Sequence, residues 1–447
     1  MTTYAEKKTQ LLAEIERLGR AGPPIVGLAK TTSNLFRDRT RTTPRVDLSQ
    51  FDQVVRVNTD EHLVEAEGMT TFVDLADATL AASAMPAVVP QLKSITLGGA
   101  VAGVGIEATS FRYGLVHDTI VAMDILTGDG RIVTCTADNE HRELFLGFPN
   151  SYATLGYALK LTARTLPVKP YVRVEHARHA DPGQFFDALA SRCVDCGVDF
   201  VDGVVFGRGD LVLTCARFVD DAPRVSDYTY DRIYYRSLRE KSIDYLPTRD
   251  YLWRWDTDWF WCSRNLGAQH ALVRRLLGRK RLNSITYQKV MRWNTRWRIT
   301  ATLNQIRGIH SESVIQDVDI PIARAAEFLD FLHREVGIVP IWICPIRAPD
   351  PSAAATLYPL RLGTLSVNFG FWDTVCSREQ RPAGFVNRKI ERKVDEVGGI
   401  KSLYSDSYFT EREFWSIYNR PAYARLKQNY DPEATLGDLY AKCVLRR

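Results

Sequence analysis

The feature that most restricts how this 447-residue chain can fold is a glycine-rich stretch near residue 100, SITLGGAVAGVGIEATSFRYG. Glycine has no Cβ, so several glycines in a short segment let backbone N–H groups approach a phosphate or a ring edge closely. The spacing does not fit a dinucleotide-binding turn, because we expect these glycines in a loop and not between a strand and a helix. Taken alone, the stretch is equally compatible with a flexible surface loop.

Three further segments accompany this stretch along the chain. The polar loop TTSNLF follows the strand pattern IVGLAK, the tight turn Gly128-Asp129-Gly130 lies downstream, and SYATLG precedes the strand pattern YALKLTARTLP. The patterns VVRVNTD and LVEAEGM predict two short strands, and FVDLADATLAASA predicts a helix. TIVAMDILT and RIVTCTA predict a hairpin around the tight turn. This part of the chain therefore predicts a lobe of mixed strands and helices.

Size and composition exclude several kinds of protein. A chain of this length with 45% hydrophobic residues can bury a large core and predicts two lobes. No run of about 18 apolar residues occurs, and the N-terminus has the pattern of a charged amphipathic helix, so we expect a soluble or peripheral protein. The eight scattered cysteines are typical of a reducing cytosol. Cys193 and Cys196 have CxxC spacing without a second pair, so we expect packing and no metal site.

Positive charge is concentrated in one segment. The net charge is +5, and no acidic residue occurs between Trp259 and Ser311. Nine basic residues gather in the part of this segment from Arg274 to Arg298: Arg274, Arg275, Arg279, Lys280, Arg281, Lys289, Arg292, Arg296 and Arg298. Because Lys and Arg are drawn to anionic lipid and Trp to the membrane interface, the segment favours an anionic membrane surface as a partner. A solvated helical face explains the charge equally well, and without a recognised motif we expect no nucleic-acid partner.

The second half of the chain predicts an α+β lobe. The strand pattern VIQDVDIP, the helix pattern IARAAEFLDFLHREVG and the strand patterns IVPIWICPI and TLSVNFGFW indicate an antiparallel sheet backed by helices. The tail from about Gly399 onward has a helical pattern. We therefore divide the chain into a first domain of residues 1–168, a substrate or cap domain of residues 169–398, and a C-terminal segment of residues 399–447 that returns to the first domain.

The ordered loops resemble the PCMH-type FAD-binding domain of the vanillyl-alcohol-oxidase superfamily. This resemblance implies a two-lobed α+β fold whose antiparallel-sheet cap binds the substrate. It also implies that the first loop holds the pyrophosphate of FAD, and that the glycine-rich stretch and the SYATLG segment line the cofactor. The implied cofactor-binding residues are Thr31, Thr32, Ser33, Asn34, Leu35, Thr96, Gly98, Gly99, Gly103, Glu107, Ser110, Gly114, Thr154 and Gly156.

Several members of that superfamily attach FAD covalently through a histidine in one of the two principal cofactor loops. Neither loop contains a histidine here, because His62 and His117 lie outside both. We therefore expect FAD that is bound non-covalently and dissociates.

Five phrases, spread over nearly the whole chain, are similar to the sterol delta-24 reductases: KTTSNLFR, LGGAVAGVGIEATSFRYGL, VIQDVDIPI, PIWICPI and SDSYFTEREFWSIYNRPAYARLKQNYD. The resemblance implies reduction of an isolated carbon–carbon double bond in a lipid, with FAD as cofactor and NADPH as a transient electron donor. The animal reductases have an N-terminal membrane anchor, and we expect none here from the charged amphipathic pattern of the first residues, which places the sterol substrate in question.

Actinobacterial relatives of this type reduce a methylene branch on a phospholipid acyl chain and so complete 10-methylstearate. The basic segment suits such a lipid better than it suits a free sterol. This resemblance implies a cytoplasmic protein that is peripheral on the inner face of the membrane, and a lipid methyltransferase as a functional partner. The alternative function is an FAD-dependent alcohol or aldonolactone oxidase or dehydrogenase.

An isolated double bond is not polarised, so a proton donor must act together with hydride from flavin N5. The candidate donors are Asp317, Tyr404, Asp406 and Glu107. Asp317 lies in the strand pattern where the relatives place polar active-site side chains. Asp406 precedes the helical pattern TEREFWSIY, so it is also compatible with a helix N-cap. A structural role in a turn or a cap stays open for each aspartate.

The substrate candidates begin with the aromatic run WRWDTDWFW. Packing in a core or between lobes explains such a run, and so does a lipid-tunnel wall whose ring faces steady positive charge on an alkene carbon. Where the decaprenyl-phosphoribose oxidases have an active-site lysine, this chain has a serine, which argues against sugar oxidation. The candidates for substrate binding are Trp253, Trp255, Trp259, Asn368 and Ser405.

Overall fold

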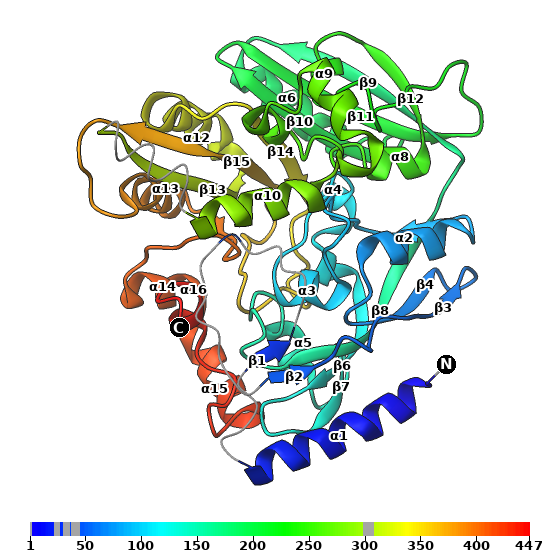
Figure 1. The fold of residues 1–447 in the computed structure, drawn as a ribbon, viewed down its shortest axis with the longest axis vertical. Helices are drawn as coiled ribbons and strands as arrows, with labels where there is room; N and C mark the ends of the chain where they lie inside the picture. Colours follow the sequence, from blue (N-terminus) through cyan, green and yellow to red (C-terminus); the bar gives the residue numbers. More distant parts are fainter. Residues whose placement is uncertain (1, 22–26, 30–35, 37–44, 298–307) are drawn as a thin grey trace.

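The structure is a computed structural model that describes residues 2–21, 27–29, 36, 45–297 and 308–447. Within these residues the chain forms two lobes, each built on an antiparallel sheet with helices around it (Figure 1). The mixed α+β architecture that the sequence predicts is confirmed. The exact domain boundaries remain a prediction.

The first lobe contains a sheet with the strand order β3-β4-β8-β6-β7, and β5 pairs separately with β8. Its strands are β3 (Val54–Asn58), β4 (Leu63–Glu67), β5 (Ala84–Pro86), β6 (Ile120–Leu126), β7 (Ile132–Thr136) and β8 (Tyr157–Pro167). A short parallel pair, β1 (Gly27–Ala29) and β2 (Arg45–Asp47), lies beside this sheet in Figure 1. The hairpin and the strands predicted in this region are therefore present.

Short helices connect these strands. They are α1 (Tyr4–Ala21), α2 (Phe72–Leu80), α3 (Leu97–Ala102), α4 (Ser110–Tyr113), the 3-10 helix η1 (Val116–Thr119) and α5 (Arg142–Gly147). The amphipathic N-terminal helix is confirmed as α1, and it is docked onto the lobe. Leu11 is fully buried, and the Lys7 ammonium lies 2.7 Å from the buried carboxylate of Glu67.

The second lobe contains an eight-stranded sheet with the order β12-β9-β11-β10-β14-β15-β13-β16. Its strands are β9 (Tyr171–His179), β10 (Phe200–Gly207), β11 (Asp210–Val219), β12 (Ile243–Pro247), β13 (His310–Pro321), β14 (Ile341–Ile346), β15 (Ser366–Ser377) and β16 (Ile400–Lys401). Neighbouring strands are antiparallel throughout. The predicted antiparallel sheet is therefore confirmed.

The helices of the second lobe are α6 (Pro182–Cys193), α7 (Tyr234–Ser237), α8 (Thr248–Leu252), η2 (Cys262–Leu266), α9 (Ala271–Leu277), η3 (Arg279–Arg281), α10 (Ser284–Trp297), η4 (Ile322–Arg324), α12 (Ala325–Phe331), the π-helix η5 (Leu332–Val336) and α13 (Phe385–Glu396). The chain ends in α14 (Glu411–Ile417), α15 (Arg420–Tyr430) and α16 (Leu439–Cys443).

The C-terminal helices return to the first lobe, where they lie beside α5 and the turn between β6 and β7 (Figure 1). Gly128 of that turn packs so closely against Asp431 that a Cβ there would lie 2.3 Å from the carboxylate. The sequence predicts a helical tail from about Gly399 onward, and this prediction is wrong for the first residues of the tail. The tail begins with β16 and an irregular segment of residues 402–410, because these residues bond to β13 and α13 instead of to one another.

The two faces of the large sheet differ in chemistry because side chains alternate along a strand. On β13, Val314, Val318 and Ile320 point to one face and pack into a hydrophobic cluster with α6, α12 and α13. Asp317 and Asp319 alternate with them and point to the opposite face. That second face is turned toward the first lobe, because Trp342 and Cys344 of β14 join the hydrophobic cluster of that lobe.

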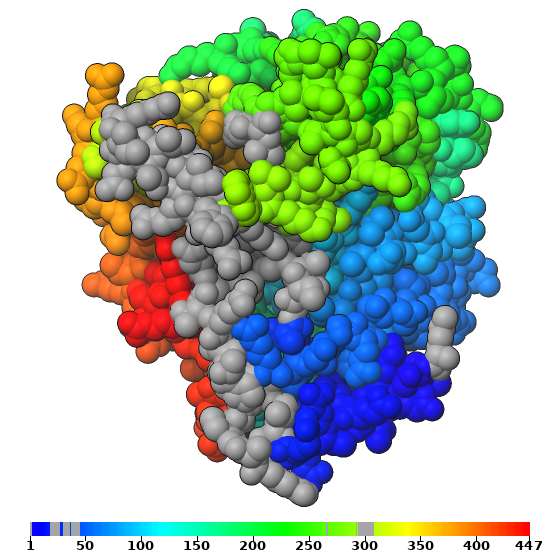
Figure 2. Space-filling view, viewed as in Figure 1, coloured from blue at the N-terminus to red at the C-terminus, as the bar shows by residue number. Residues whose placement is uncertain are grey.

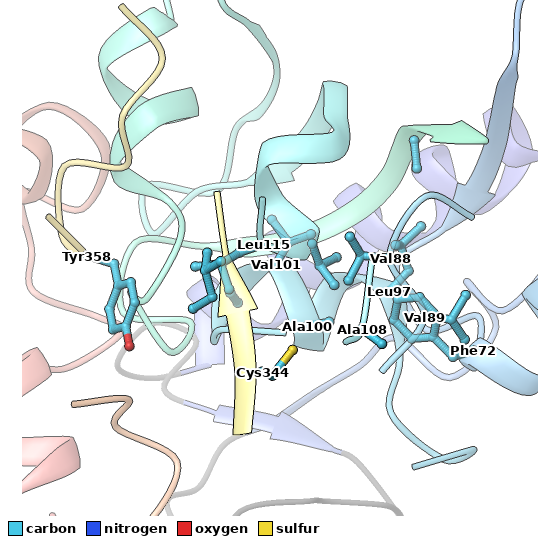
Figure 3. Close-up of a cluster of buried hydrophobic side chains, with 14 of the residues drawn as sticks. Phe72, Val88, Val89, Leu97, Ala100, Val101, Ala108, Leu115, Cys344 and Tyr358 are labelled. Atoms are coloured by element: carbon cyan, nitrogen blue, oxygen red, sulfur yellow. The ribbon is translucent and has the colours of Figure 1, made fainter. Parts of the chain in front are cut away.

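Figure 3 shows this junction, with Cys344 of β14 beside Ala100 and Ala108 of the first lobe. The core is continuous between the two lobes here. Functional groups carried by the sheet therefore face the glycine-rich stretch across a packed interface.

The glycine-rich stretch itself is not a loop throughout, so one prediction is corrected. Gly98 and Gly99 lie in the short helix α3, where the Thr96 side chain accepts a hydrogen bond from the Gly99 N–H. A Cβ at Gly98 would lie only 2.8 Å from the backbone oxygen of Gly68. Close packing against the neighbouring strand end, and not a ligand, therefore requires glycine at position 98.

Candidate active site

Three strands of the large sheet, β13, β15 and β14, place their side chains next to one another on the face turned toward the first lobe. Asp317 pairs in register with Gly370, and Gly370 pairs with Trp342 on the next strand. One step along the same face, Asp319 pairs with Asn368. The missing side chain of Gly370 leaves space for a neighbouring carboxyl group, since a Cβ there would lie 2.7 Å from Asp317 Oδ1.

Asp317 and Tyr404, two of the predicted proton donors, are brought together by the fold. Their side chains are hydrogen-bonded to each other. The pKa of Asp317 is raised to about 8: burial raises it most, the hydrogen bond from Tyr404 opposes the rise, and the negative charge of Asp319 adds to it. Burial, together with the Asp317 carboxylate, raises the pKa of Tyr404 well above its usual range. Asp317 is therefore the member of the pair that exchanges a proton near neutral pH.

Asp319 has a different environment, although it lies on the same strand and the same face. Its carboxylate accepts hydrogen bonds from Asn368 Nδ2 and from the Tyr358 hydroxyl, each at 2.8 Å. Burial raises its pKa to about 6, and the two hydrogen bonds limit the rise. Asp317 thus keeps its proton at a pH at which Asp319 has lost its own, as expected for neighbouring carboxyl groups in unlike surroundings.

The segment that carries Tyr404 is held at both ends. On one side, Ser402 donates a backbone hydrogen bond of 3.1 Å to the Asp317 carbonyl. On the other, Glu391 of α13 accepts hydrogen bonds from the Lys401 ammonium at 2.8 Å and from the Tyr408 backbone N–H at 3.1 Å. Because Lys401 and Glu391 are both buried, their pairing fixes the segment, and with it the Tyr404 side chain, relative to β13.

The fourth predicted donor, Glu107, lies in a separate buried network. Arg254 Nη2 lies 2.7 Å from Glu107 Oε1 and 2.9 Å from Asp202 Oδ2. Asp202 also accepts a hydrogen bond of 3.3 Å from the Trp342 indole. Burial raises the pKa of Glu107, and the attraction of Arg254 opposes that rise. Arg254 therefore ties the glycine-rich stretch to the central strands of the large sheet.

Asp406 is not part of the constellation around Asp317. Its carboxylate lies 3.1 Å from Arg446 near the C-terminus. The N-cap of the following helix is Thr410, which forms a capping box with Glu413, so the N-cap role considered for Asp406 is also excluded. Ser405 is buried beside Tyr404, and its hydroxyl has no hydrogen-bond partner among the described residues.

The three candidate tryptophans do not form one wall. Trp255 stacks on Phe260 in the core with ring centroids 4.6 Å apart. Trp259 stacks on Phe36 at 5.6 Å, and Phe36 in turn meets the Tyr404 ring edge-on at 5.7 Å. Only Trp259 is therefore linked through an aromatic contact to the Asp317–Tyr404 pair.

Trp259 and Phe260 adopt a left-handed backbone, with φ of 42° and 61°. Such a conformation is unusual for bulky aromatic residues and persists where the surrounding structure imposes it. The strained pair places Trp259 toward Tyr404 and Phe260 against Trp372, whose ring centroid is 4.8 Å away. Trp253, by contrast, lines a surface cavity together with Lys93.

The predicted FAD residues divide into three groups. Thr31, Thr32, Ser33, Asn34 and Leu35 lie outside the described residues. Gly98, Gly114 and Gly156 are explained by packing: an added Cβ would lie 2.8 Å from Gly68 O, 2.3 Å from Asp118 Oδ2 and 2.5 Å from an Ile125 methyl carbon, respectively. The Ser110 and Thr154 hydroxyls form local hydrogen bonds, with the Glu107 N–H and the Ser151 carbonyl.

Of the remaining cofactor candidates, Gly103 lies where a loop crosses the end of α3. Tyr152 and Asn150 donate backbone hydrogen bonds to the carbonyls of Ala102, at 2.7 Å, and Gly103, at 3.1 Å. Asn150, Tyr152 and Ala153 all have positive φ angles, between 47° and 62°. Three strained non-glycine residues in one short loop are typical of a loop shaped for a ligand. Gly99 is exposed on the same helix.

The residues near this loop fit FAD. Buried polar atoms need hydrogen-bond partners, so those without one in the protein indicate a polar ligand or water. In the first lobe, Glu107 Oε2, Asn150 Oδ1, Ser151 Oγ and Thr109 Oγ1 are buried and have no partner among the described residues. These carboxylate, amide and hydroxyl groups suit the amide, imide and hydroxyl groups of a flavin and its ribityl chain.

Sequence reasoning missed Asp202, Arg254 and Asp319. Two signals were present. Asp202 interrupts an otherwise apolar strand pattern, FVDGVVFG, and Asp319 follows Asp317 by two residues and so shares its face. Arg254 gave no signal of its own, because it lies inside the aromatic run and its partners come from 147 and 52 residues away in the chain.

Comparison with known proteins defines the class. Residues 2–136 match the model of the FAD binding domain family. These residues therefore carry an FAD-binding domain of the PCMH type within a two-lobed α+β architecture, as FAD-dependent oxidoreductases do.

The similarity to individual proteins extends much further along the chain. The chain is homologous to the Delta(24)-sterol reductases: it is 25% identical to that of Arabidopsis thaliana over 435 residues, which cover 89% of this chain and 76% of the relative. It is 23% identical to the Homo sapiens Delta(24)-sterol reductase, with 87% and 75% covered. Cytokinin dehydrogenase 7 of Oryza sativa is 27% identical over 146 residues, which cover 32% of this chain and 28% of the relative.

Two further observations concern membranes and metals. Of the helices in the described part of the chain, none is both long and apolar enough to span a bilayer. Among the same residues, no three His, Cys, Asp or Glu side chains are grouped so that they could share a metal ion. Cys193 and Cys196 are free thiols, one half-buried and the other exposed.

Proposed function

We propose that this protein reduces an isolated carbon–carbon double bond in a lipid, with FAD as a non-covalent cofactor and NADPH as electron donor. The observation that carries the proposal is the Asp317 carboxyl group. It lies on the sheet face turned toward the FAD-binding lobe, has a pKa raised to about 8, and is hydrogen-bonded to Tyr404. A carboxylic acid that is protonated at neutral pH is the group that protonation of an unpolarised alkene requires.

Each residue of the proposed site has a separate role in the reaction. FAD, when bound and reduced, supplies hydride to one carbon of the double bond. Asp317 delivers a proton to the other carbon, so the alkene gains two hydrogens and Asp317 is left as a carboxylate. Tyr404 donates a hydrogen bond to that carboxylate and holds it in place. Asp319 stays ionised on its hydrogen bonds to Asn368 and Tyr358, and its charge keeps the proton on Asp317 before the reaction.

The substrate we propose is the methylene-branched acyl chain of a phospholipid, and the α9–α10 surface supports this choice. Among the described residues, six of the thirteen exposed large hydrophobic side chains lie on α9 and α10: Leu272, Leu276, Ile285, Val290, Met291 and Trp293. Arg275, Arg281 and Lys289 are exposed among them. Helix α10 forms a ridge across the face shown in Figure 2. Apolar and basic side chains together favour insertion into an anionic membrane.

Arg274 is an exception within the basic segment. Its side chain is 2% exposed and pairs with Asp258 at 2.5 Å, so it holds α9 in place and is not available to lipid. The side chains of Arg292 and Arg296, and residue Arg298, lie outside the described part of the structure. The proposed membrane surface therefore rests on the exposed residues of α9, η3 and α10. An S-adenosylmethionine-dependent lipid methyltransferase is the proposed partner, because it would form the methylene branch.

An anaerobic titration of the yellow protein tests the proposal. NADPH should bleach the flavin absorbance, and vesicles of a methylene-branched phospholipid should restore it while the methyl-branched lipid forms. Vesicles of the saturated lipid are the control and should leave the flavin reduced. Bleaching by an alcohol or an aldonolactone, without bleaching by NADPH, would instead establish the oxidase. Acid precipitation of the same sample should leave the yellow colour in the supernatant, because no covalent bond retains the flavin.

A further inference from the structure

A cavity of about 340 Å³ lies at the junction of the two lobes, apart from the Asp317–Tyr404 pair. Its walls come from α8 and the residues that follow it, from η3 between α9 and α10, and from Lys93 just before the glycine-rich stretch. Five cationic side chains and two carboxylates line it: Lys93, Arg249, Arg254, Arg279, Lys280, Asp250 and Asp256. The lining therefore carries an excess of positive charge.

Several of these charges are held in fixed positions. Asp256 is satisfied on both oxygens, by Lys93 at 2.9 Å and by the Ser284 hydroxyl at 2.6 Å. Arg249 and Arg279 pair with Asp77 and Asp227, two carboxylates that do not line the cavity. Lys280 is exposed and forms no ion pair with any described residue. The cations are thus oriented around the cavity, and one of them, Lys280, has no counterion among the described residues.

Two buried donors point to a ligand. Trp253 and Arg254 are 5% and 3% exposed, and both line the cavity. The Trp253 indole Nε1 and the Arg254 Nε have no hydrogen-bond partner among the described residues. The other guanidinium nitrogens of Arg254 are occupied by Glu107, Asp202 and the Tyr251 carbonyl. Buried N–H groups without acceptors are costly, so the two donors favour an oxygen-rich ligand.

We propose that this cavity binds a phosphate group. Arginine and lysine are the side chains that bind phosphate oxygens, and neutral N–H donors complete such sites. The volume is in the range of small-molecule sites and exceeds what a single ion needs. Two sources carry this chemistry: the phosphates of NADPH and the phosphodiester of a phospholipid. Arg254 joins the cavity to Glu107 of the glycine-rich stretch, so either ligand would lie next to the flavin-binding lobe.

A titration with inorganic pyrophosphate tests the site directly, with the full-length, FAD-loaded protein in a calorimeter. The double variant Arg279→Gln/Lys280→Gln removes two cations from the lining. The matched control, Arg275→Gln/Arg281→Gln, removes two exposed cations from the same surface that do not line the cavity. We expect saturable binding that weakens at least about tenfold in the first variant, since each lost cation removes a charged hydrogen bond to phosphate oxygen, and that is unchanged in the control. The single variant Lys280→Gln breaks no ion pair within the described residues and repeats the test if the double variant is unstable.

Two further measurements separate the sources. If NADPH is the ligand, the NADPH concentration for half-maximal anaerobic bleaching rises in the cavity variant only, and both variants lose vesicle binding equally. If a phospholipid head group is the ligand, sedimentation with phosphatidylcholine–phosphatidylglycerol vesicles weakens more in the cavity variant than in its control. Absence of saturable pyrophosphate binding, or equal weakening in both variants, would overturn the proposal. Pyrophosphate binding is measured without turnover. The test of the phosphate site therefore stays valid even if the protein reduces no lipid.

Discussion

Asp317 and Asp319 lie two residues apart on β13 and point to the same face, yet their carboxyl groups have different partners. Asp319 accepts two hydrogen bonds, from an amide and a hydroxyl, whereas Asp317 is bonded to Tyr404 and lies beside the charge of Asp319. Burial acts on both and raises both pKa values. Asp317 therefore keeps its proton at pH 7, whereas Asp319 loses its own. The difference comes from the hydrogen-bond partners and from the earlier ionisation of Asp319, whose charge raises the pKa of Asp317.

The pH dependence of alkene reduction follows from this pair. Only protonated Asp317 can donate, so the rate should fall as the pH rises through about 8. Asp319→Asn removes the negative charge that raises the pKa of Asp317, so the falling limb should move to lower pH. The measurement is single-turnover oxidation of the reduced enzyme by lipid across a pH series. Flavin reduction by NADPH is the control and should not follow this limb. A limb that stays in place in Asp319→Asn would show that Asp317 does not cause it.

The free energy of unfolding should also depend on pH through Asp317. An Asp residue has an ordinary pKa of about 3.9, and the folded protein raises the Asp317 pKa to about 8. The native state thus holds a proton that the unfolded chain releases, so the stabilising contribution is complete below about pH 4 and is lost as the pH rises toward 8. Asp317→Asn removes this loss. The variant should therefore unfold at a higher temperature than the wild type at pH 8, with a smaller difference at pH 5.

At the scale of elements, one buried arginine links three segments. Arg254 follows α8, Glu107 belongs to the glycine-rich stretch and Asp202 to β10. All three side chains are almost fully buried, so each carboxylate depends on the guanidinium for a counter-charge. These ion pairs position the FAD-binding lobe against the central strands of the cap. They fix the relative orientation of the two lobes more specifically than a hydrophobic interface alone, because ion pairs are directional.

Removing this arginine should be costly. Arg254→Met leaves two carboxylates buried without a counter-charge, and breaking a buried ion pair in this way costs about 3–5 kcal/mol. Arg249→Met breaks the exposed pair with Asp77, which is worth about 0–1 kcal/mol. Denaturant unfolding of both variants at constant FAD concentration compares them. If Arg254→Met is no less stable than Arg249→Met, the network does not hold the lobes together.

Helices α9 and α10 make the membrane prediction specific. Leu276 is 83% exposed and Trp293 is 57% exposed, whereas Val194, at 84%, lies elsewhere on the molecule. Leu276→Ser/Trp293→Ser should lower the vesicle partition coefficient by more than about tenfold, since burying even one such side chain contributes about 1.5–3 kcal/mol. Val194→Ser should have no effect. Binding should require anionic lipid and weaken as salt rises. Binding that persists without anionic lipid, or that Val194→Ser reduces equally, would contradict this surface.

For the whole molecule, local sequence patterns predicted the parts that depend on local physics. The alternation in VIQDVDIP identified β13 and placed Asp317 on a strand, and the amphipathic N-terminal pattern identified α1. The glycine-rich stretch indicated close backbone approach, but the partner of Gly98 is the strand end at Gly68 and not a ligand. That assignment needs two segments 30 residues apart to be placed in space, which periodicity does not provide.

The parts that could not be predicted depend on long-range contacts. The aromatic run indicated burial, but its tryptophans separate into a core, a contact near Tyr404 and a cavity wall, because positive φ angles at Trp259 and Phe260 turn the chain. Arg254 is surrounded by aromatic residues in the sequence, and its acidic partners come from the other lobe and from a distant strand. Register between β13 and β15, which places Gly370 beside Asp317, was equally inaccessible.

The most direct test of the account is a stopped-flow comparison of the two half-reactions in Asp317→Asn, which keeps the shape of the side chain and removes the acid. Reduction of the flavin by NADPH should proceed at the wild-type rate. Oxidation of the reduced enzyme by a methylene-branched phospholipid should slow by about 100-fold to 10,000-fold, the range for a lost general acid. Tyr404→Phe should have a smaller effect on the same step, because Tyr404 positions Asp317 and does not supply the proton. An oxidative half-reaction that proceeds at the normal rate in Asp317→Asn would contradict the proposed mechanism.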